Sequence, residues 1–410
     1  MGERLVPATA AELRDAVAWA AAEDVQLEVV GHGSKRGLGR PVQAASPLDL
    51  SRLQGIVAYE PEELVLSART GTPLAEVETL LAGRRQMLAF EPPDFAPLWG
   101  GLPGAGSLGG AIACNLAGPR RIMAGAARDH VLGFSAVSGR GEAFKAGGRV
   151  VKNVTGYDLC KLMAGSFGTL AVMDEVTLKV LPAPETARTV LLFGLDPEAA
   201  TAALAEALGS TCDVSGAAHL PGAAASRSGV DDVRRAGASV TAVRVEGTAV
   251  SVAARTESLR LLLADRGRAA SELHTTPSRL FWREVRDVLP LLPGDALALW
   301  RVSVPPGAGA GVAAVVAGEH FFDWGGGLVW IAVEASLGPG APGEDFGAGA
   351  LRAAIASSGG PWGGHATLMR APEPVRASVP VFEPLAPALA ALTRRVKLGF
   401  DPNRILNPGR

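Results

Sequence analysis

Apolar residues recur at helical spacing near the N-terminus and at strand spacing directly after it. In residues 9–23, Leu13, Val17 and Trp19–Ala20 fall on one face of a helix, because residues three and four apart share a face. Residues 25–30 (VQLEVV) follow as an apolar run with β-branched residues, which predicts a strand. The chain therefore opens with a helix that leads into a largely buried strand.

The same alternation extends through the first 185 residues. It predicts strands at 49–59 and 63–72, a helix at 73–84, a short helix at 110–115, a hairpin at 128–153, a short helix at 157–163 and a strand at 170–181. Pro182 and Pro184 then interrupt the pattern and mark a predicted domain boundary, because proline ends regular structure.

The second half of the chain repeats one unit, a strand-like run followed by a helix-like run. The four predicted pairs are 188–195 with 196–209, 239–247 with 248–265, 295–305 with 307–318, and 326–335 with 347–358. Helices that lie between strands of one sheet predict an α+β domain of ferredoxin-like repeats. The chain as a whole is therefore expected to be α+β.

Composition narrows the class of protein. The 410 residues are 48% hydrophobic and 20% charged, with a formal net charge of −2, so no electrostatic footprint for nucleic acid or an anionic membrane is present. No apolar run of about 18 residues and no apolar signal core occur, which favours a cytoplasmic location with membrane contact only through a partner. The three cysteines form no C-x-x-C, and the six histidines are never two or four apart, so no metal site is predicted.

The stretch Leu27–Gly39 (LEVVGHGSKRGLG) carries the first chemical signal. Glycines after a strand let the backbone N–H groups approach a ligand closely, and Ser34, Lys35 and Arg36 add a hydroxyl and two cations. These features predict a diphosphate cradle. The spacing matches neither a Walker loop nor a Rossmann fingerprint, and a plain glycine-rich surface turn is the alternative.

A second glycine-rich stretch, residues 88–121, is long and irregular. Its prolines exclude regular structure, while its glycines permit tight packing. A plain irregular loop is the alternative, but loops of this length inside compact domains are uncommon unless they have a function.

These segments, in this order, resemble the FAD-binding domain of the vanillyl-alcohol oxidase / p-cresol methylhydroxylase-type flavoproteins. The resemblance rests on VVGHGSKRGLG, GAGSLGGAIACNLAG, the pair RDHVLGF and YDLCKLMAGSFGTLAVMDEVTLKV, and the tail FDPNRILNPGR. It implies a two-part FAD-binding domain at 1–185, a ferredoxin-like cap at 186–392 and a C-terminal return at 393–410. The FAD-binding residues that it implies are Gly31, His32, Gly33, Ser34, Lys35, Gly39, Gly104, Gly106, Ser107, Gly109, Gly110, Asn115, Gly118, Gly165, Ser166, Gly168, Thr169, Val172 and Asn407.

The resemblance also implies how FAD is held. Covalent members of the family have a histidine at the position that matches Ser34, and His32 lies two residues earlier, so the expected FAD is non-covalent.

Within this family the chain is most similar to the smaller FAD-binding subunits of bacterial glycolate oxidases, through the segment Gly363–Arg370 and the tail. This implies flavin-dependent oxidation of glycolate, a small hydroxy acid, to glyoxylate. It also implies a catalytic flavin subunit and an iron–sulphur subunit as partners. The catalytic members carry an H-x-G-D-G-N stretch that this chain lacks. His365, as the base, and Arg370, as a carboxylate ligand, are the candidate catalytic residues in its place.

Two other functions stay open at this point. The chain could be a stand-alone FAD-dependent oxidase or dehydrogenase of another hydroxy acid or alcohol, or a non-catalytic structural subunit that kept the fold. Two aromatic turns, 322–327 (FDWGGG) and 361–365 (PWGGH), are candidates for a surface near the flavin or a partner.

Overall fold

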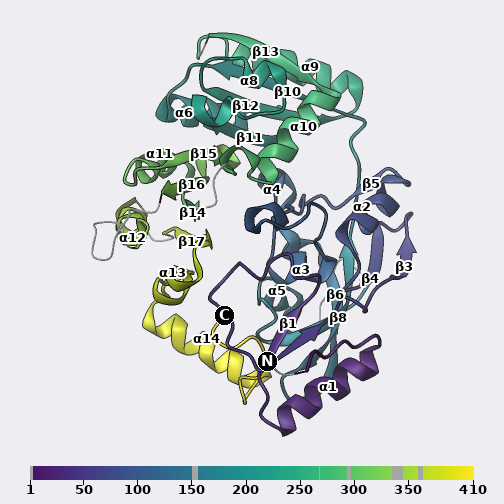
Figure 1. The fold of residues 1–410 in the computed structure, drawn as a ribbon. Helices are drawn as coiled ribbons and strands as arrows, with labels where there is room; N and C mark the ends of the chain where they lie inside the picture. The colour runs from purple at the N-terminus through teal and green to yellow at the C-terminus, as the bar shows by residue number, and fades with distance from the viewer. Residues whose placement is uncertain (1–2, 150–155, 267, 293–296, 335–344, 359–362) are drawn as a thin grey trace. The chain divides into compact units, whose positions relative to one another are not determined.

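A computed structural model describes residues 3–149, 156–266, 268–292, 297–334, 345–358 and 363–410, and the chain divides into two compact units (Figure 1). The first unit comprises Met1–Ala117, Gly125–Ala183 and Pro384–Arg410, and the second comprises Gly118–Ala124 and Pro184–Glu383. The division after Ala183 lies within two residues of the expected boundary. The C-terminal return begins at Pro384 rather than at 393, and the short segment Gly118–Ala124 belongs to the second unit.

One part of the first unit is a small parallel sheet. Strand β1 (Leu27–Val30) pairs in parallel with β2 (Ser46–Asp49), and helix α1 (Ala10–Ala22) contributes Leu13, Val17 and Ala20 to the core beneath them. Trp19, predicted on that same face, is 45% exposed, so this prediction is wrong; the narrow buried stripe of α1 excludes it. The C-terminal segment extends the sheet, because the Leu27 N–H donates to the Ile405 carbonyl and the Asn407 N–H donates to the Leu27 carbonyl.

The other part of the first unit is a five-stranded antiparallel sheet. Its strand order is β3 (Ile56–Glu60), β4 (Val65–Arg69), β8 (Ala171–Lys179), β6 (Val131–Ser138) and β7 (Ala143–Gly147). A two-stranded sheet of β5 (Gln86–Met87) and β9 (Leu181–Pro182) accompanies it. The helices of this part are α2 (Leu74–Ala82), α3 (Leu108–Ala113), α5 (Leu159–Met163) and α14 (Pro387–Phe400), with the 3-10 turns η1 (Ala96–Trp99) and η2 (Ala127–Asp129). The expected two-part arrangement of the N-terminal domain is thus present.

The second unit is built on one eight-stranded antiparallel sheet. Its strand order is β13 (Arg268–His274), β10 (Thr186–Phe193), β12 (Val240–Gly247), β11 (Val214–Leu220), β15 (Glu319–Asp323), β16 (Leu328–Glu334), β14 (Leu297–Ser303) and β17 (His365–Arg370). Its longer helices are α6 (Pro197–Leu208), α9 (Ala249–Leu262), α10 (Thr275–Arg286) and α12 (Ala348–Ser358), and its shorter ones are α4 (Arg121–Ala124), α7 (Gly222–Ala225), α8 (Asp231–Arg234), α11 (Gly309–Ala313) and α13 (Glu373–Ser378), with the 3-10 turns η3 (Leu289–Leu291), η4 (Pro306–Ala308) and η5 (Trp324–Gly326).

Three of the four expected strand–helix pairs are confirmed in this unit, and the α+β class with them. The helix expected at 307–318 after β14 is reduced to the 3-10 turn η4 and the short helix α11. Strands β11, β13, β15 and β17 and helix α10 were not predicted. The predicted segments at 150–153, 295–296 and residue 335, and the first part of the 361–365 turn, lie outside the described residues.

The two halves of the eight-stranded sheet are covered differently. In the half around β10, Val190 faces the core formed with α6 and α9, while Thr189 bonds to Ser278 and Trp282 of α10 on the opposite face. In the half around β14, Val302 and its neighbours face a core completed by α11 and α12. The opposite face of that half carries Arg301, Ser303, Thr367 and His365, which pair with one another across β14 and β17.

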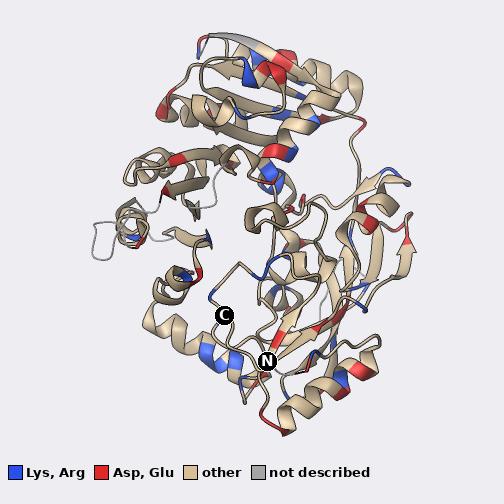
Figure 2. Cartoon of the chain, in the orientation of Figure 1, with Lys and Arg blue, Asp and Glu red and all other residues tan. Residues whose placement is uncertain are grey.

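Charged residues of both signs are distributed over both units, with Lys and Arg marking α4 and the middle of α14 (Figure 2). Over the described ranges, none of the helices has the length and apolar character that crossing a bilayer requires.

Candidate functional site

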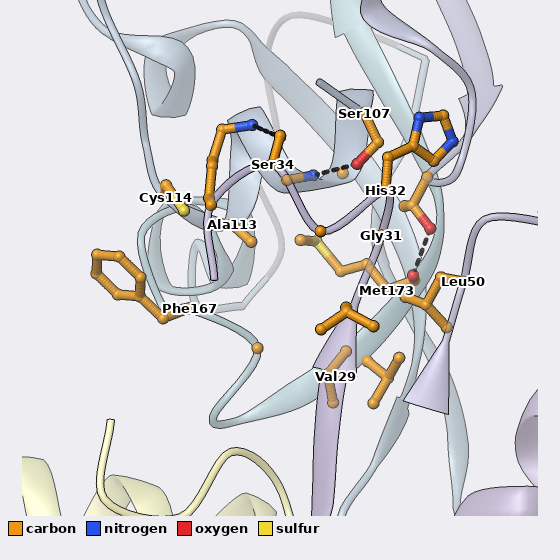
Figure 3. Close-up of a pocket in the computed structure, with 18 of the residues that line it drawn as sticks. Val29, Gly31, His32, Ser34, Leu50, Ser107, Ala113, Cys114, Phe167 and Met173 are labelled. Atoms are coloured by element: carbon orange, nitrogen blue, oxygen red, sulfur yellow. Dashed lines mark hydrogen bonds between the residues drawn. The ribbon is translucent and has the colours of Figure 1, made fainter. Parts of the chain in front are cut away.

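A pocket in the first unit has about 770 Å³ of empty space, part of it open to solvent. It forms where β1, the loop after it, the start of α3 and the turn before β8 converge (Figure 3). Its lining residues are Val29, Val30, Gly31, His32, Gly33, Ser34, Lys35, Arg36, Leu50, Thr70, Ser107, Gly109, Gly110, Ala113, Cys114, Phe167, Gly168, Ala171, Val172, Met173 and Arg410.

Two glycines allow the pocket walls to approach each other. A Cβ on Gly31 would lie 2.4 Å from the Ser107 Oγ, and one on Gly109 would lie 2.5 Å from the Thr70 Cβ. The Gly109 N–H donates to the Thr70 carbonyl at 2.8 Å, so α3 is fixed directly against the end of β4. These backbones leave no room for a side chain, and at Gly109 this is the tight packing that the sequence predicted for the second glycine-rich stretch.

Lys35 and Arg36 are neighbours with different surroundings. The Arg36 guanidinium is held by Glu28, with its Nε 2.9 Å from the Glu28 Oε1, and this carboxylate raises the pKa of Arg36. The Lys35 Nζ lies 3.3 Å from the Ser34 Oγ, and within the described residues no carboxylate is within hydrogen-bond distance of it. Burial lowers the pKa of Lys35, although Cys114 and Asp94 act in the opposite sense. Lys35 is thus a partly buried cation without a hydrogen-bonded carboxylate, and it lies on a glycine-containing loop. Such a cation is suited to binding an anionic ligand.

Cys114 lies at the same end of the pocket as Phe167, away from His32 (Figure 3). Burial raises the pKa of its thiol, and the positive charges of Lys35 and Arg410 only partly offset that. The thiol is therefore protonated at neutral pH and is no thiolate nucleophile.

Asn407 supports the pocket from behind rather than lining it. Its Oδ1 accepts the Val29 N–H at 2.8 Å and its Nδ2 donates to the Phe167 carbonyl at 2.7 Å. One side chain from the C-terminal segment thereby joins β1 to the turn that precedes β8, and both contribute residues to the pocket.

The pocket brings together ten of the residues expected to bind FAD: Gly31, His32, Gly33, Ser34, Lys35, Ser107, Gly109, Gly110, Gly168 and Val172. Eight others lie in the first unit without lining it: Gly39, Gly104, Gly106, Asn115, Gly165, Ser166, Thr169 and Asn407. Gly118 belongs to the second unit, where its carbonyl accepts from the Trp324 Nε1. The buried Ser166 Oγ has no hydrogen-bond partner among the described residues, which leaves it available to a ligand.

Sequence reasoning missed the apolar part of the wall. Leu50, Ala113, Phe167, Ala171 and Met173 contribute to the pocket from four different segments. In a sequence, apolar residues at such positions cannot be told apart from residues of the hydrophobic core. Only the folded structure, which brings them to one pocket, identifies them as lining residues. Thr70 and Arg410 carried no signal either.

The two candidate catalytic residues lie at opposite ends of β17 in the second unit. His365 pairs across the sheet with Ser303, whereas Arg370 pairs with Leu299. Five residues of strand separate them by about 16 Å, which is too far for both to hold one small carboxylate. Partial desolvation, together with the charges of Arg301 and Arg121, lowers the pKa of His365. No group of three or more potential metal-ligating His, Cys, Asp or Glu residues occurs in the described part of the chain.

Comparisons with known proteins show which proteins this chain is similar to. Residues 4–147 match the FAD binding domain family. The glycolate oxidase subunit GlcE of Escherichia coli (strain K12) is 34% identical over 403 residues, which cover 97% of this chain and 96% of that protein. The glycolate oxidase subunit GlcD of Bacillus subtilis (strain 168) is 31% identical over 151 residues, which cover 37% of this chain and 30% of that protein.

The fold is also found among solved structures. A crystal structure of p-cresol methylhydroxylase with substrate bound superposes with a TM-score of 0.71 at 15% identity, covering 99% of this chain and 88% of that one. The structural likeness supports the fold that the sequence predicted, the p-cresol methylhydroxylase type.

Proposed function

The chain belongs to the family of the glycolate oxidase subunit GlcE, and we propose that it is the FAD-binding subunit of a glycolate oxidase complex, which oxidises glycolate to glyoxylate and passes the electrons to partner subunits. The observation that carries this proposal is that near full-length similarity coincides with a glycine-lined pocket, to which the matched FAD-binding segment and the later residues 167–173 both contribute.

The pocket fits FAD. Lys35 and the N–H groups of the Gly31–Ser34 loop are suited to the diphosphate, and Gly31, Gly33, Gly109, Gly110 and Gly168 line the pocket without side chains. When bound there, FAD supplies the two-electron acceptor for oxidation of a hydroxy acid. Ser34 offers a hydroxyl and Cys114 a protonated thiol, so the proposed attachment is non-covalent.

His365 is the proposed base. Its lowered pKa keeps the imidazole neutral at pH 7, and a neutral ring nitrogen can accept the proton of a substrate hydroxyl. Arg370 is not part of this proposal, because it lies at the far end of the strand.

Electrons have to leave this chain through a partner. Its three cysteines (Cys114, Cys160 and Cys212) include no C-x-x-C, so we propose that a catalytic flavin subunit and an iron–sulphur subunit complete the complex. The proposed location is the cytoplasm, with contact to a membrane only through those subunits.

A visible spectrum with anaerobic glycolate tests the proposal. The isolated chain should be yellow, and glycolate should bleach it only when the partner subunits are present. Bleaching of the chain alone would identify a stand-alone dehydrogenase. A colourless chain inside an active complex would identify a structural subunit.

A pair of glycine variants tests the placement of FAD. Gly109→Ala puts a methyl group against Thr70 and should release FAD, whereas Gly399→Ala adds the same group at a position in α14 with nothing within 4 Å. FAD content per chain is the measurement. Equal FAD content in both variants would contradict the assigned pocket.

A further inference from the structure

Helix α14, yellow in Figure 1, has two halves with different surroundings. In its second half, Val396 and Phe400 pack against the core of the five-stranded sheet, and the Lys397 Nζ donates to the Leu406 carbonyl at 3.0 Å. In its first half, every residue from 387 to 395 is exposed. Within the described part of the protein, about two and a half turns of this helix therefore have no buried side.

The exposed half is apolar, although apolar residues normally face a core. Residues 387–392 (PALAAL) include no charged or hydrogen-bonding side chain, and Leu389 and Leu392 are 49% and 52% exposed. Leu385, directly before the helix, is 48% exposed. Isolated helices this short are marginal in water, because most helical stability in proteins comes from packing an apolar face. An exposed apolar surface of this kind indicates a place where another molecule binds.

The apolar side chains of α14 follow one line along the helix. Leu389, Leu392 and Val396 are three and then four residues apart, so they share a face with the a, d and a spacing of a coiled-coil seam. Val396 packs against the core of its own unit, whereas Leu389 and Leu392 continue the same line into solvent. Alanines at 388, 390 and 391 keep the helix surface beside the leucines low, so a second helix can approach closely. We call this line the α14 seam.

Two adjacent arginines lie at different places relative to the α14 seam. Arg395 precedes Val396 directly and takes position g of the heptad, at the edge of the seam, whereas Arg394 takes position f, on the far side of the helix. Both side chains are exposed. Residues at position g choose the partner of a helix, because they form ion pairs with it across the seam. An arginine there selects a partner helix with a carboxylate.

The local charges argue against a second copy of this chain as the occupant. Between residues 384 and 410 the sequence has a single acidic residue, Asp401. It is fully buried, and its carboxylate accepts from Lys397 and from the N–H groups of Ile405 and Leu406. A second α14 thus has no carboxylate to offer to an arginine. Two half-exposed leucines also fall far short of the roughly 800 Å² that each side of a stable dimer buries.

The side chains of the exposed half also argue against a membrane surface. Helices that lie in a membrane interface combine their cationic face with a broad apolar face that carries Trp or Phe. The exposed residues 387–395 include no aromatic side chain. The aromatic ring of α14, Phe400, lies in the packed half, 5.9 Å from the ring of Phe144. A narrow line of leucines bordered by alanines fits another helix better than it fits lipid.

We propose that the α14 seam binds an amphipathic helix of a partner subunit, with apolar residues against Leu389 and Leu392 and an acidic residue against Arg395. The proposal rests on the function proposed above, because that function supplies the partner subunits. Such a subunit also has to contact the chain elsewhere, since the seam alone is small. Helix α14 contributes no residue to the lining of the FAD pocket, so changes in its exposed half should leave the FAD content unchanged.

The test measures the Kd between the full-length, FAD-loaded chain and the purified catalytic flavin and iron–sulphur subunits of the same organism, by biolayer interferometry. Leu389→Ser combined with Leu392→Ser should raise this Kd at least about tenfold, because two leucines lose their burial against the partner. Leu261→Ser combined with Leu262→Ser is the matched control. These leucines, on α9, are 71% and 39% exposed, and their loss should leave the Kd unchanged.

Charge reversal tests the acidic contact separately and changes no apolar side chain. Arg395→Glu should raise the Kd by about three- to tenfold, since it replaces an exposed ion pair with a repulsion. Arg394→Glu is its matched control and should change the Kd little, because position f faces away from the partner. Equal effects of the two reversals would contradict an acidic residue opposite Arg395.

Each other outcome overturns the α14 seam as a site for a partner helix. Wild-type affinity in the double leucine variant of α14 does so while the proposed function stands, whereas a wild-type chain that binds neither subunit refutes both. A lower free energy of unfolding of that variant in the isolated chain would show that the leucines pack within the chain itself. Dimerisation of the isolated wild type that the variant abolishes would identify a second copy as the occupant. Sedimentation with vesicles of phosphatidylcholine and phosphatidylglycerol that the variant abolishes would identify a membrane.

Discussion

Twice in this chain two neighbouring cations have different surroundings. In the first unit, Arg36 is paired with Glu28 while Lys35 faces the glycine-walled pocket. In the second unit, Arg120 and Arg121 are adjacent, and Arg120 joins a buried ion cluster: its Nε and Nη2 lie 3.0 and 2.9 Å from the Glu246 carboxylate, which also lies 3.4 Å from the Arg244 Nε. Arg121 lies over Trp324.

The difference separates structural cations from those that are available to a ligand. Arg36 has the carboxylate of Glu28, and Arg120 and Arg244 share that of Glu246, so the fold itself supplies each of them with an ion-pair partner. Lys35 and Arg301 have no hydrogen-bonded carboxylate in the described ranges, and burial lowers the pKa of each. A buried cation without a hydrogen-bonded carboxylate, such as Lys35 or Arg301, lowers the stability of the fold unless a ligand anion pairs with it. The comparison can be tested by removing charges one at a time.

The largest effect is expected from Glu246→Gln. This change leaves Arg120 and Arg244 buried without their carboxylate, and breaking a buried pair in this way costs about 3–5 kcal/mol of the free energy of unfolding. Urea unfolding followed by tryptophan fluorescence measures it. A loss below about 1 kcal/mol would mean that the cluster is not what balances these arginines.

The cation that faces the first pocket should matter for FAD rather than for folding. Lys35→Gln should weaken FAD binding by about 10- to 100-fold, since a hydrogen bond to a charged group contributes about 1.5–3 kcal/mol. Arg36→Gln is the matched control, because Glu28 already engages Arg36, and FAD affinity should change little. Comparable losses of FAD affinity in Lys35→Gln and Arg36→Gln would contradict the assignment of Lys35, but not Arg36, to FAD binding.

Lowering the pH should weaken the ion cluster of Arg120, Glu246 and Arg244, because it protonates the Glu246 carboxylate. Burial would raise the pKa of Glu246, but Arg244 and Arg120 outweigh it and lower the pKa from 4.5 to about 2. A carboxylate with a depressed folded-state pKa stabilises the protein fully above its unfolded value and loses that contribution as the pH falls. The stability gap between the wild type and Glu246→Gln should therefore be constant above about pH 4.5 and close as the pH falls towards 2. A gap that does not change with pH would refute this linkage.

The smallest effect is expected from Arg301→Gln measured as stability. No hydrogen bond in the described ranges is lost with its guanidinium, and a desolvated charge is removed, so the free energy of unfolding should change by less than about 1 kcal/mol. If Arg301→Gln lowered the free energy of unfolding as much as Glu246→Gln does, Arg301 would be needed for stability rather than available to a ligand. Urea unfolding under the same conditions gives both numbers.

The sequence by itself determined what depends on local chemistry. The strand-to-glycine passage at Val30–Gly33 and the glycines at Gly109 and Gly168 were read from the sequence as ligand loops, and all of them line the pocket. The alternation after Pro184 predicted β10, β12, β14 and β16 with the helices α6, α9 and α12, but not β11, β13, β15, β17 or α10. Each of these signals depends on only a few consecutive residues. The similarity of the whole chain to the glycolate oxidase subunit GlcE supports the same fold.

Only the tertiary structure decided which side chains meet. The separation of His365 from Arg370 follows from the strand direction of β17, and the meeting of Arg121, Arg301 and Trp324 joins residues some 180 positions or more from Arg121 through strand register and a left-handed turn. Nothing local distinguishes Arg120 from Arg121, or Lys35 from Arg36. Their roles differ because the partner charges come from distant strands, and that proximity arises only when the chain folds.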